Sequence, residues 1–207
     1  MGVEAVVFDV GQVLVQWDPR HLYRTLFPDP DRMEFFLSEV CTPAWNLELD
    51  RGMDWDEALS ERIARYPSFE REIRAFWERW DEMVPGAIEG TVRLLEALAA
   101  DGMPLFALTN FNAHTFARTR ARFPFFRHLR GAVVSGEEGI VKPDPRIYRL
   151  LTTRYGLDPP QTLFIDDVHA NVEAAQECGW QGLRFTDPAA LREDLARLGL
   201  ICAGVAP

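Results

Sequence analysis

Short apolar runs recur along the chain, and each of them stops at polar residues. The first run, Ala5-Val6-Val7-Phe8, leads directly into Asp9. Continuous apolar runs of this length are typical of strands that are buried on both faces of a parallel sheet. Five strands are therefore predicted, at Ala5–Phe8, Pro104–Leu108, Ala132–Val134, Thr162–Ile165 and Gly182–Phe185.

Helical patterns separate the later apolar runs. In the first of them, 88–100, apolar residues recur at helical spacing, and the pattern stops at Asp101-Gly102, where a helix end is expected. Alternating strands and helices predict an α/β fold with a doubly wound parallel sheet and right-handed crossovers. The predicted helices are Ile88–Ala100, Ala113–Arg122, Pro145–Tyr155, Ala170–Cys178 and Pro188–Leu198.

The stretch between the first two strands departs from this alternation. It is too long for a loop and shows helical patterns without a convincing strand. We therefore predict an all-helical cap at 17–84, inserted into an α/β core made of 1–16 and 85–207. Residues 42–46 are expected to form a turn between cap helices. The predicted cap helices are His21–Phe27, Arg32–Val40, Asp56–Tyr66 and Glu70–Met83.

Composition narrows the class of protein. The chain has 207 residues and a net charge of -10, which argues against nucleic acid or an anionic membrane as a partner. Three cysteines without metal-type spacing indicate reduced thiols in a cytoplasmic protein. The apolar start is too short for a signal peptide or a membrane span. The composition is compatible with a monomer or a homodimer.

Lys142 is the only lysine, and the other twenty-one cationic side chains are arginines. Lysine offers a compact point charge, whereas arginine offers a broad planar fork. The lysine lies in the segment Gly139-Ile140-Val141-Lys142-Pro143-Asp144-Pro145. The alternative is that a single lysine remains by chance in a composition biased toward arginine. The neighbouring motifs are needed to distinguish a functional lysine from a chance one.

Carboxylate, hydroxyl and amide side chains follow directly after three of the predicted strands. Asp9 ends the first strand, Thr109-Asn110 follow the second, and Asp166-Asp167 follow the fourth. Ligands bind beyond the carboxyl ends of the strands in an open α/β sheet. Three carboxylates brought together repel one another unless a cation is supplied. Lys142 and a bound Mg²⁺, which prefers carboxylates, water and phosphate oxygens, would supply the charge.

The order of these segments resembles that of the haloacid dehalogenase-like (HAD) hydrolase superfamily over nearly the whole chain. Within that superfamily the chain is most similar to a subgroup whose first motif reads Phe-Asp-x-Gly-x-Val, here Phe8-Asp9-Val10-Gly11-Gln12-Val13-Leu14. The cap stretch Trp45-Asn46-Leu47-Glu48-Leu49-Asp50-Arg51-Gly52 also resembles that subgroup. The resemblance implies a Rossmann-like core, a helical cap and a Mg²⁺-dependent phosphatase, which is a phosphoric monoester hydrolase.

The resemblance also implies roles in phosphoryl transfer. Asp9 would be the nucleophile and would form an aspartyl-phosphate that water then hydrolyses. Thr109 and the backbone amide of Asn110 would hold the phosphoryl oxygens. Lys142 would neutralise the charge that Asp9 shares with the phosphoryl group.

A metal site follows from the same resemblance, and its cofactor would be Mg²⁺. Asp9 and Asp167 would be direct ligands, and Asp166 would assist directly or through water. Gly11 would contribute its backbone carbonyl. As the plain alternative, the acids at 166 and 167 would only cap the helix that follows.

One position departs from the pattern of most phosphatases in the superfamily. They carry a second aspartate, the general acid/base, where this chain has Gly11. Such a group contributes about 10²–10⁴-fold in rate. Either the leaving group is activated, as in a sugar 1-phosphate or an aryl phosphate, or another residue substitutes, for which Asp18 is the candidate. A third possibility is that turnover has been lost.

The substrate is expected to be a small phosphorylated metabolite, with a sugar phosphate favoured. Trp45, Asn46 and Arg51 are the candidate substrate contacts in the cap, with packing roles as the alternative. Two other functions stay open. One is a metal-independent 2-haloacid dehalogenase, which uses the same aspartate and lysine, and the other is a non-catalytic binding protein.

Overall fold

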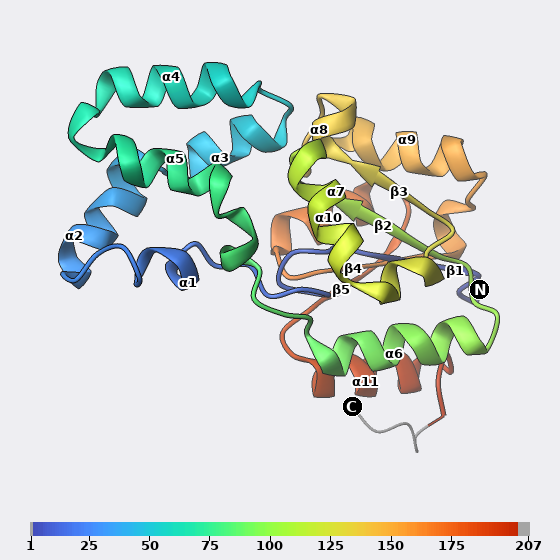
Figure 1. Cartoon of the computed structure of the whole chain (residues 1–207). Helices are drawn as coiled ribbons and strands as arrows, with labels where there is room; N and C mark the ends of the chain where they lie inside the picture. The colour runs from blue at the N-terminus through green and yellow to red at the C-terminus, as the bar shows by residue number, and fades with distance from the viewer. Residues whose placement is uncertain (1, 203–207) are drawn as a thin grey trace.

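The computed structural model describes residues 2–202, in which a single parallel sheet has the strand order β3-β2-β1-β4-β5 (Figure 1). Neighbouring strands are in parallel register, with Val7 opposite Phe106 on one side and Phe164 on the other. The doubly wound sheet predicted from the apolar runs is confirmed. Its strands are β1 (Ala5–Phe8), β2 (Leu105–Thr109), β3 (Gly131–Val134), β4 (Thr162–Asp166) and β5 (Gln181–Arg184).

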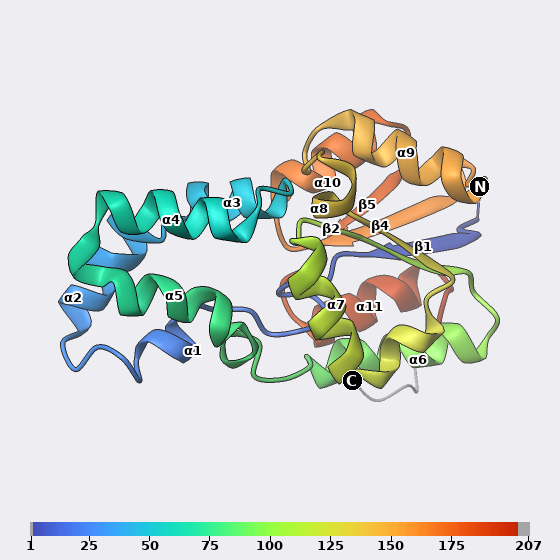
Figure 2. The ribbon, with the colours of Figure 1, turned by 45° about the horizontal axis from the view of Figure 1, so that its top comes forward.

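Helices cover both faces of the sheet (Figure 2). Alternate residues of β1 face opposite sides, as the period of a strand requires. Val6 and Phe8 belong to a cluster with the helices α6 and α11, whereas Ala5 and Val7 pack with α9. The core helices are α6 (Glu89–Ala100), α7 (Ala113–Arg122), α8 (Ser135–Glu138), α9 (Pro145–Tyr155), α10 (His169–Glu177) and α11 (Pro188–Arg197).

The segment between β1 and β2 folds into helices beside the sheet, at the left of Figure 1. Its bounds as an independent cap stay a prediction, although the predicted 17–84 contains all of these helices. No helix in 2–202 has both the length and the apolarity to span a bilayer. The helices of the segment are α1 (Arg20–Tyr23), α2 (Pro30–Phe35), the π-helix η1 (Phe36–Val40), α3 (Pro43–Asp50), α4 (Trp55–Arg65), η2 (Pro67–Phe69), α5 (Glu70–Glu78) and η3 (Trp80–Met83).

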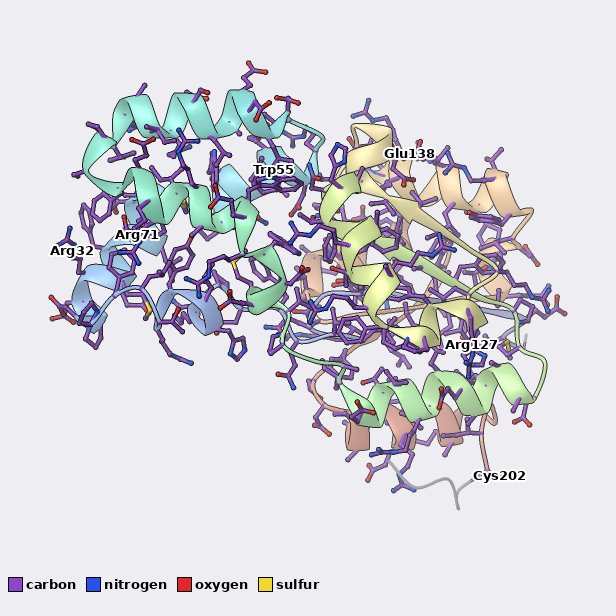
Figure 3. The ribbon with its side chains drawn as sticks, in the orientation of Figure 1. Arg32, Trp55, Arg71, Arg127, Glu138 and Cys202 are labelled. Atoms are coloured by element: carbon purple, nitrogen blue, oxygen red, sulfur yellow. The ribbon has the colours of Figure 1, made fainter. Side chains whose placement is uncertain are left out.

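Aromatic side chains hold the cap together. The Phe76 ring lies 5.2 Å from Trp45 and 5.7 Å from Trp80, centroid to centroid. Trp55, labelled in Figure 3 at the end of the cap nearest the sheet, lies 4.7 Å from Trp77. Large aromatic rings in contact bury much apolar surface in a small volume. The cap aromatics belong to one hydrophobic cluster that continues under the sheet.

Two sequence predictions in the cap were wrong. Residues 42–46 are not a turn, because Thr42 accepts a hydrogen bond from the backbone N–H of Trp45 (3.1 Å) and caps α3, with Pro43 at its start. The predicted helix 70–83 is broken at Arg79, whose φ of -113° and ψ of 24° leave the helical region. The break redirects Trp80, which packs on Phe111 of the core (5.8 Å).

The end of α3 is tied to the core by hydrogen bonds. Asn112 donates from its side-chain amide to the Leu49 carbonyl (3.0 Å), and the Ser135 hydroxyl donates to the Asp50 carbonyl (2.5 Å). A β-carbon on Gly52 would lie 3.0 Å from the carbonyl oxygen of Gly136. The backbones of cap and core therefore meet with no room for side chains between them.

Gly136 is expected to be essential for this close contact. A β-carbon there would lie 2.6 Å from the backbone nitrogen of Ala113 and 2.8 Å from the carbonyl oxygen of Phe111. Gly136→Ala should therefore lower the free energy of unfolding by about 1–3 kcal/mol, a typical cost of overpacking. Gly86→Ala is the control, because a β-carbon there meets nothing within 4 Å. Equal urea midpoints for the two variants would contradict the prediction.

Candidate active site

Three of the four predicted motifs meet through one buried ammonium. The Lys142 Nζ lies 2.9 Å from Oδ1 of Asp9 and 2.6 Å from Oδ2 of Asp166. The side chains of Lys142 and Asp166 are 1% and 0% exposed, and that of Asp9 is 10% exposed. Because β1 and β4 are adjacent and parallel, their carboxyl ends bring both acids to the same edge of the sheet.

Burial and charge act in opposite directions on Lys142. Burial lowers its pKa, but the charges of Asp166 and Asp9 and their hydrogen bonds outweigh burial, so the pKa is raised. The ammonium also lies 5.4 Å from the centroid of the Phe164 ring, a cation–π distance. Lys142 therefore stays charged at neutral pH. Two buried acids next to a single cation leave a net negative charge at the site.

Asn110 holds the loop that carries Lys142. Its side-chain oxygen accepts from the backbone N–H of Lys142 (2.7 Å), and its amide donates to the backbone carbonyl of the same residue (3.0 Å). This reciprocal pair joins the end of β2 to the lysine loop. Thr109, the last residue of β2, is buried beside it. Phosphate binding by Thr109 and by the backbone amide of Asn110 stays a prediction.

The carboxylate of Asp166 is held by several protein donors. Besides Lys142, it accepts from the backbone N–H of Val168 (2.8 Å) and from the side-chain amide of Asn171 (3.1 Å to each oxygen). Asp167, by contrast, is half-buried and lines an open cavity. Burial raises the pKa of Asp167, and the charge of Asp166 raises it further. Asp167 is therefore the acid of the pair that is free to bind a cation.

The donor set fits a hard divalent cation. Oxygens of Asp9, Asp166 and Asp167 all lie within 4.8 Å of one another. Burial, opposed by Lys142 but reinforced by the charges of Asp166 and Asp167, raises the pKa of Asp9 to about 7. Excess negative charge of this kind is what a bound cation relieves. Carboxylates and a backbone carbonyl at Gly11 are ligands that Mg²⁺ accepts.

A cavity of about 220 Å³ opens beside Gly11 and Asp167. Both the sheet and the cap contribute to it. A second cavity of about 540 Å³ is lined mainly by cap residues and shares Gln12, Trp17 and Asn46 with the first. The residues around the first cavity are Gly11, Gln12, Trp17, Asn46, Asp50, Trp80, Asn110, Phe111, Asp167 and Val168.

The sequence pattern of the haloacid dehalogenase-like hydrolases matches residues 3–179. The chain belongs to this family of hydrolases. Among curated proteins, the chain is similar to a sesquiterpene phosphatase of Aspergillus oryzae, which is 28% identical over 94% of this chain and 96% of that protein. Flavin mononucleotide hydrolase 1 of Arabidopsis thaliana is 33% identical, and the match covers 55% of this chain but only 46% of that protein.

Solved structures show the same HAD fold. A predicted HAD-like hydrolase from Porphyromonas gingivalis has a TM-score of 0.72 at 20% identity, over 96% of this chain and 98% of that one. A HAD enzyme from Bacteroides thetaiotaomicron, in complex with magnesium and inorganic phosphate, has a TM-score of 0.66 at 21% identity. That match covers 90% of this chain and 96% of the other.

The predicted cap contacts separate into two groups. Asn46 lines both cavities. Trp45 instead points into the cap, where it is 3% exposed and packs on Phe76, with the Arg62 guanidinium 5.3 Å from its ring. Arg51 is exposed and pairs with Glu48 (2.8 Å). Of the three predicted contacts, only Asn46 lines the cavity that contains Gly11 and Asp167.

The predicted substitute acid, Asp18, is placed elsewhere. Its carboxylate accepts from the backbone N–H of Arg20 (2.9 Å) at the start of α1. It lines the cap cavity but not the cavity that contains Gly11 and Asp167. The sequence gives no sign of this separation, because it depends on where the chain turns after β1.

Sequence reasoning missed Asp50, a buried acid that lines the cavity next to Gly11. Asn46, which was singled out, donates to its Oδ2 across one helical turn (2.9 Å). The spacing of four residues was the available signal, since residues at i and i+4 share a helix face. The turn predicted at 42–46 conceals this signal, because a turn at Asn46 would not place it on a helix face with Asp50.

Removing the buried ammonium is expected to destabilise the protein. Lys142→Met leaves two buried carboxylates without their cation, and one-sided loss of a buried pair costs about 3–5 kcal/mol. Urea unfolding in EDTA at pH 8 measures the effect. The second change Asp166→Asn should restore part of the loss. Arg154→Met, which breaks a surface pair with Glu138 (2.7 Å), should cost under about 1 kcal/mol. A Lys142→Met variant as stable as this control would refute the role of Lys142 as the cation that compensates the two buried carboxylates.

Proposed function

We propose that this chain is a Mg²⁺-dependent phosphatase that hydrolyses a small phosphate monoester through an aspartyl-phosphate on Asp9. The observation that carries the proposal is Lys142, whose ammonium bridges Asp9 and Asp166 beside a third acid, Asp167. Relatives named as phosphatases support this kind of activity. The HAD enzyme crystallised with magnesium and phosphate shares the fold.

The chemistry follows from the placement of charge. A carboxylate oxygen of Asp9 attacks phosphorus, and the bond from phosphorus to the leaving oxygen breaks. Lys142 offsets the negative charge that gathers between Asp9 and the phosphoryl group. Asp9, Asp167 and the carbonyl of Gly11 would hold Mg²⁺, which supplies further charge compensation. Water then attacks the aspartyl-phosphate, releasing phosphate and restoring the Asp9 carboxylate.

The cap cavity indicates which leaving group fits. Apolar side chains form much of its wall, including Trp17, Leu37 and Phe76, while Arg20 and Glu34 pair with each other (2.6 Å). Such a lining favours an apolar or aromatic alcohol over a hydroxyl-rich sugar. The sugar phosphate favoured by the sequence stays a prediction. The name of the Aspergillus relative, a sesquiterpene phosphatase, agrees with an apolar alcohol.

Metal removal and loss of the nucleophile should both abolish turnover. Phosphate release should be screened on aryl, prenyl and sugar phosphates and on nucleotides, with Mg²⁺ and with EDTA. We expect hydrolysis that EDTA stops, and a loss of roughly a thousand-fold or more in Asp9→Asn. Halide release from 2-haloacids that persists in EDTA would identify a dehalogenase instead. No turnover of any ester would favour a binding protein.

Trp17 should contribute to binding of the leaving group, because it lines both cavities. We expect Trp17→Ala to raise KM for an aryl or prenyl phosphate about tenfold, which corresponds to about 1.4 kcal/mol. Inhibition by inorganic phosphate, which has no leaving group, should change little. Trp17→Phe is the matched control and should retain most of the affinity. A parallel loss of phosphate inhibition in Trp17→Ala would show general damage to the site.

A further inference from the structure

We propose that Asp50, from the cap, gives its proton to the leaving oxygen and later takes a proton from the attacking water. It thereby fills the acid/base role that Gly11 cannot. The inference rests on the proposed aspartyl-phosphate chemistry of Asp9 and deepens it. Asp50 does not come from the strand motif but from the last residue of α3.

The space on the strand side is open. A β-carbon built on Gly11 would meet nothing within 4 Å. Asp50 lines the same cavity as Gly11 and Asp167. The cavity therefore has an acid on its cap wall, at Asp50, whereas Gly11 on its strand wall has no side chain.

Asp50 is held in place from both sides. The amide of Asn46 donates to its Oδ2 (2.9 Å), and the backbone N–H of Asn112 donates to its carboxyl group. Its own backbone carbonyl accepts from the Ser135 hydroxyl (2.5 Å). Two of these three partners belong to the core. The position of Asp50 relative to the sheet edge is thus fixed by the ties between cap and core, as an acid/base group requires.

The surroundings of Asp50 keep a substantial fraction of it protonated at neutral pH. Burial raises its pKa to about 7, with the N–H of Asn112 and the charge of Lys142 opposing and the charge of Asp9 reinforcing the shift. An acid whose pKa lies near the working pH can both give and take a proton efficiently. Asp50 as a whole residue is 7% exposed, and the cavity gives its carboxyl group access to substrate.

The two proton transfers balance. As the bond from phosphorus to the leaving oxygen breaks, the carboxylic acid of Asp50 protonates that oxygen and becomes a carboxylate. The carboxylate then takes a proton from water while the water oxygen attacks phosphorus. The bond from phosphorus to Asp9 breaks, and Asp50 is again protonated for the next turnover.

A purely structural Asp50 predicts different behaviour. Its hydrogen bonds join α3 to Asn112, so a structural role would affect all substrates equally. A proton donor matters most when the leaving alkoxide is a strong base. The ratio of rates on alkyl and aryl phosphates therefore separates the two roles.

The test compares Asp50→Asn with the wild type on 4-nitrophenyl phosphate and on an alkyl phosphate, with Mg²⁺. We expect about a 10²–10⁴-fold loss of kcat on the alkyl ester and less than about tenfold on the aryl ester. The fall in alkyl-ester kcat/KM as pH rises through the pKa of Asp50 should vanish. Asp54→Asn is the control, because it is an exposed acid four residues away that caps α4 and asparagine also caps helices.

Adding Gly11→Asp to Asp50→Asn should recover at least about tenfold of the lost alkyl-ester rate, because it places an acid in the open space at the strand. Equal losses on both esters with an unchanged pH profile would overturn the inference. If Asp50→Asn does not fold, the wild type decides alone. Its rates should depend little on the basicity of the leaving alcohol, and a steep dependence overturns the inference.

These outcomes differ from failure of the proposed function. Wild-type protein without phosphate release, or Asp9→Asn with full release, removes the aspartyl-phosphate mechanism and the inference with it. Wild-type turnover that requires Asp9, combined with an Asp50→Asn variant of unchanged substrate ratio, removes only the role of Asp50.

Discussion

The ammonium of Lys142 between two buried carboxylates is the interaction on which the rest of this site depends. Buried charges are costly unless they are paired and hydrogen-bonded. Here Asp9 and Asp166 supply the pairing, and Asn110 fixes the loop that delivers the lysine. The sheet supplies the rest, because parallel neighbouring strands end side by side. Of the three acids at the strand ends, the arrangement leaves Asp167 facing the cavity, with an excess of negative charge.

The sheet could be predicted from the sequence because its strands are buried on both faces and therefore appear as unbroken apolar runs. The strand-end residues followed from the same pattern, and Lys142 stood out because no other lysine competes with it. The features of the site that the sequence did not predict depend on how the cap packs against the core. Asp50 reaches the cavity only because Asn112 and Ser135 hold the end of α3 against the core. The sequence places Trp45 near the substrate because its segment is predicted to be a turn. Instead, the side chain of Thr42 forms the N-terminal cap of a helix that includes Trp45, and the indole ring is buried.

The boundary between cap and core therefore has two functions in this fold. It closes a cavity over the strand ends, and it supplies side chains that the strand motif lacks. Hydrogen bonds from core side chains to the last carbonyls of α3 satisfy a helix end that would otherwise be unpaired. The same bonds set the depth at which cap residues enter the site. Changes at Asn112 or Ser135 would thus alter chemistry without touching a strand-end acid.

The near-absence of lysine has a practical consequence. The polypeptide has one side-chain amine, that of Lys142, and its side chain is 1% exposed. An isotope label placed on lysine would give a single side-chain resonance, free of overlap, from the centre of the site. Amine-directed reagents would find no accessible lysine on the folded surface. The protein thus carries an intrinsic spectroscopic probe of its own electrostatics.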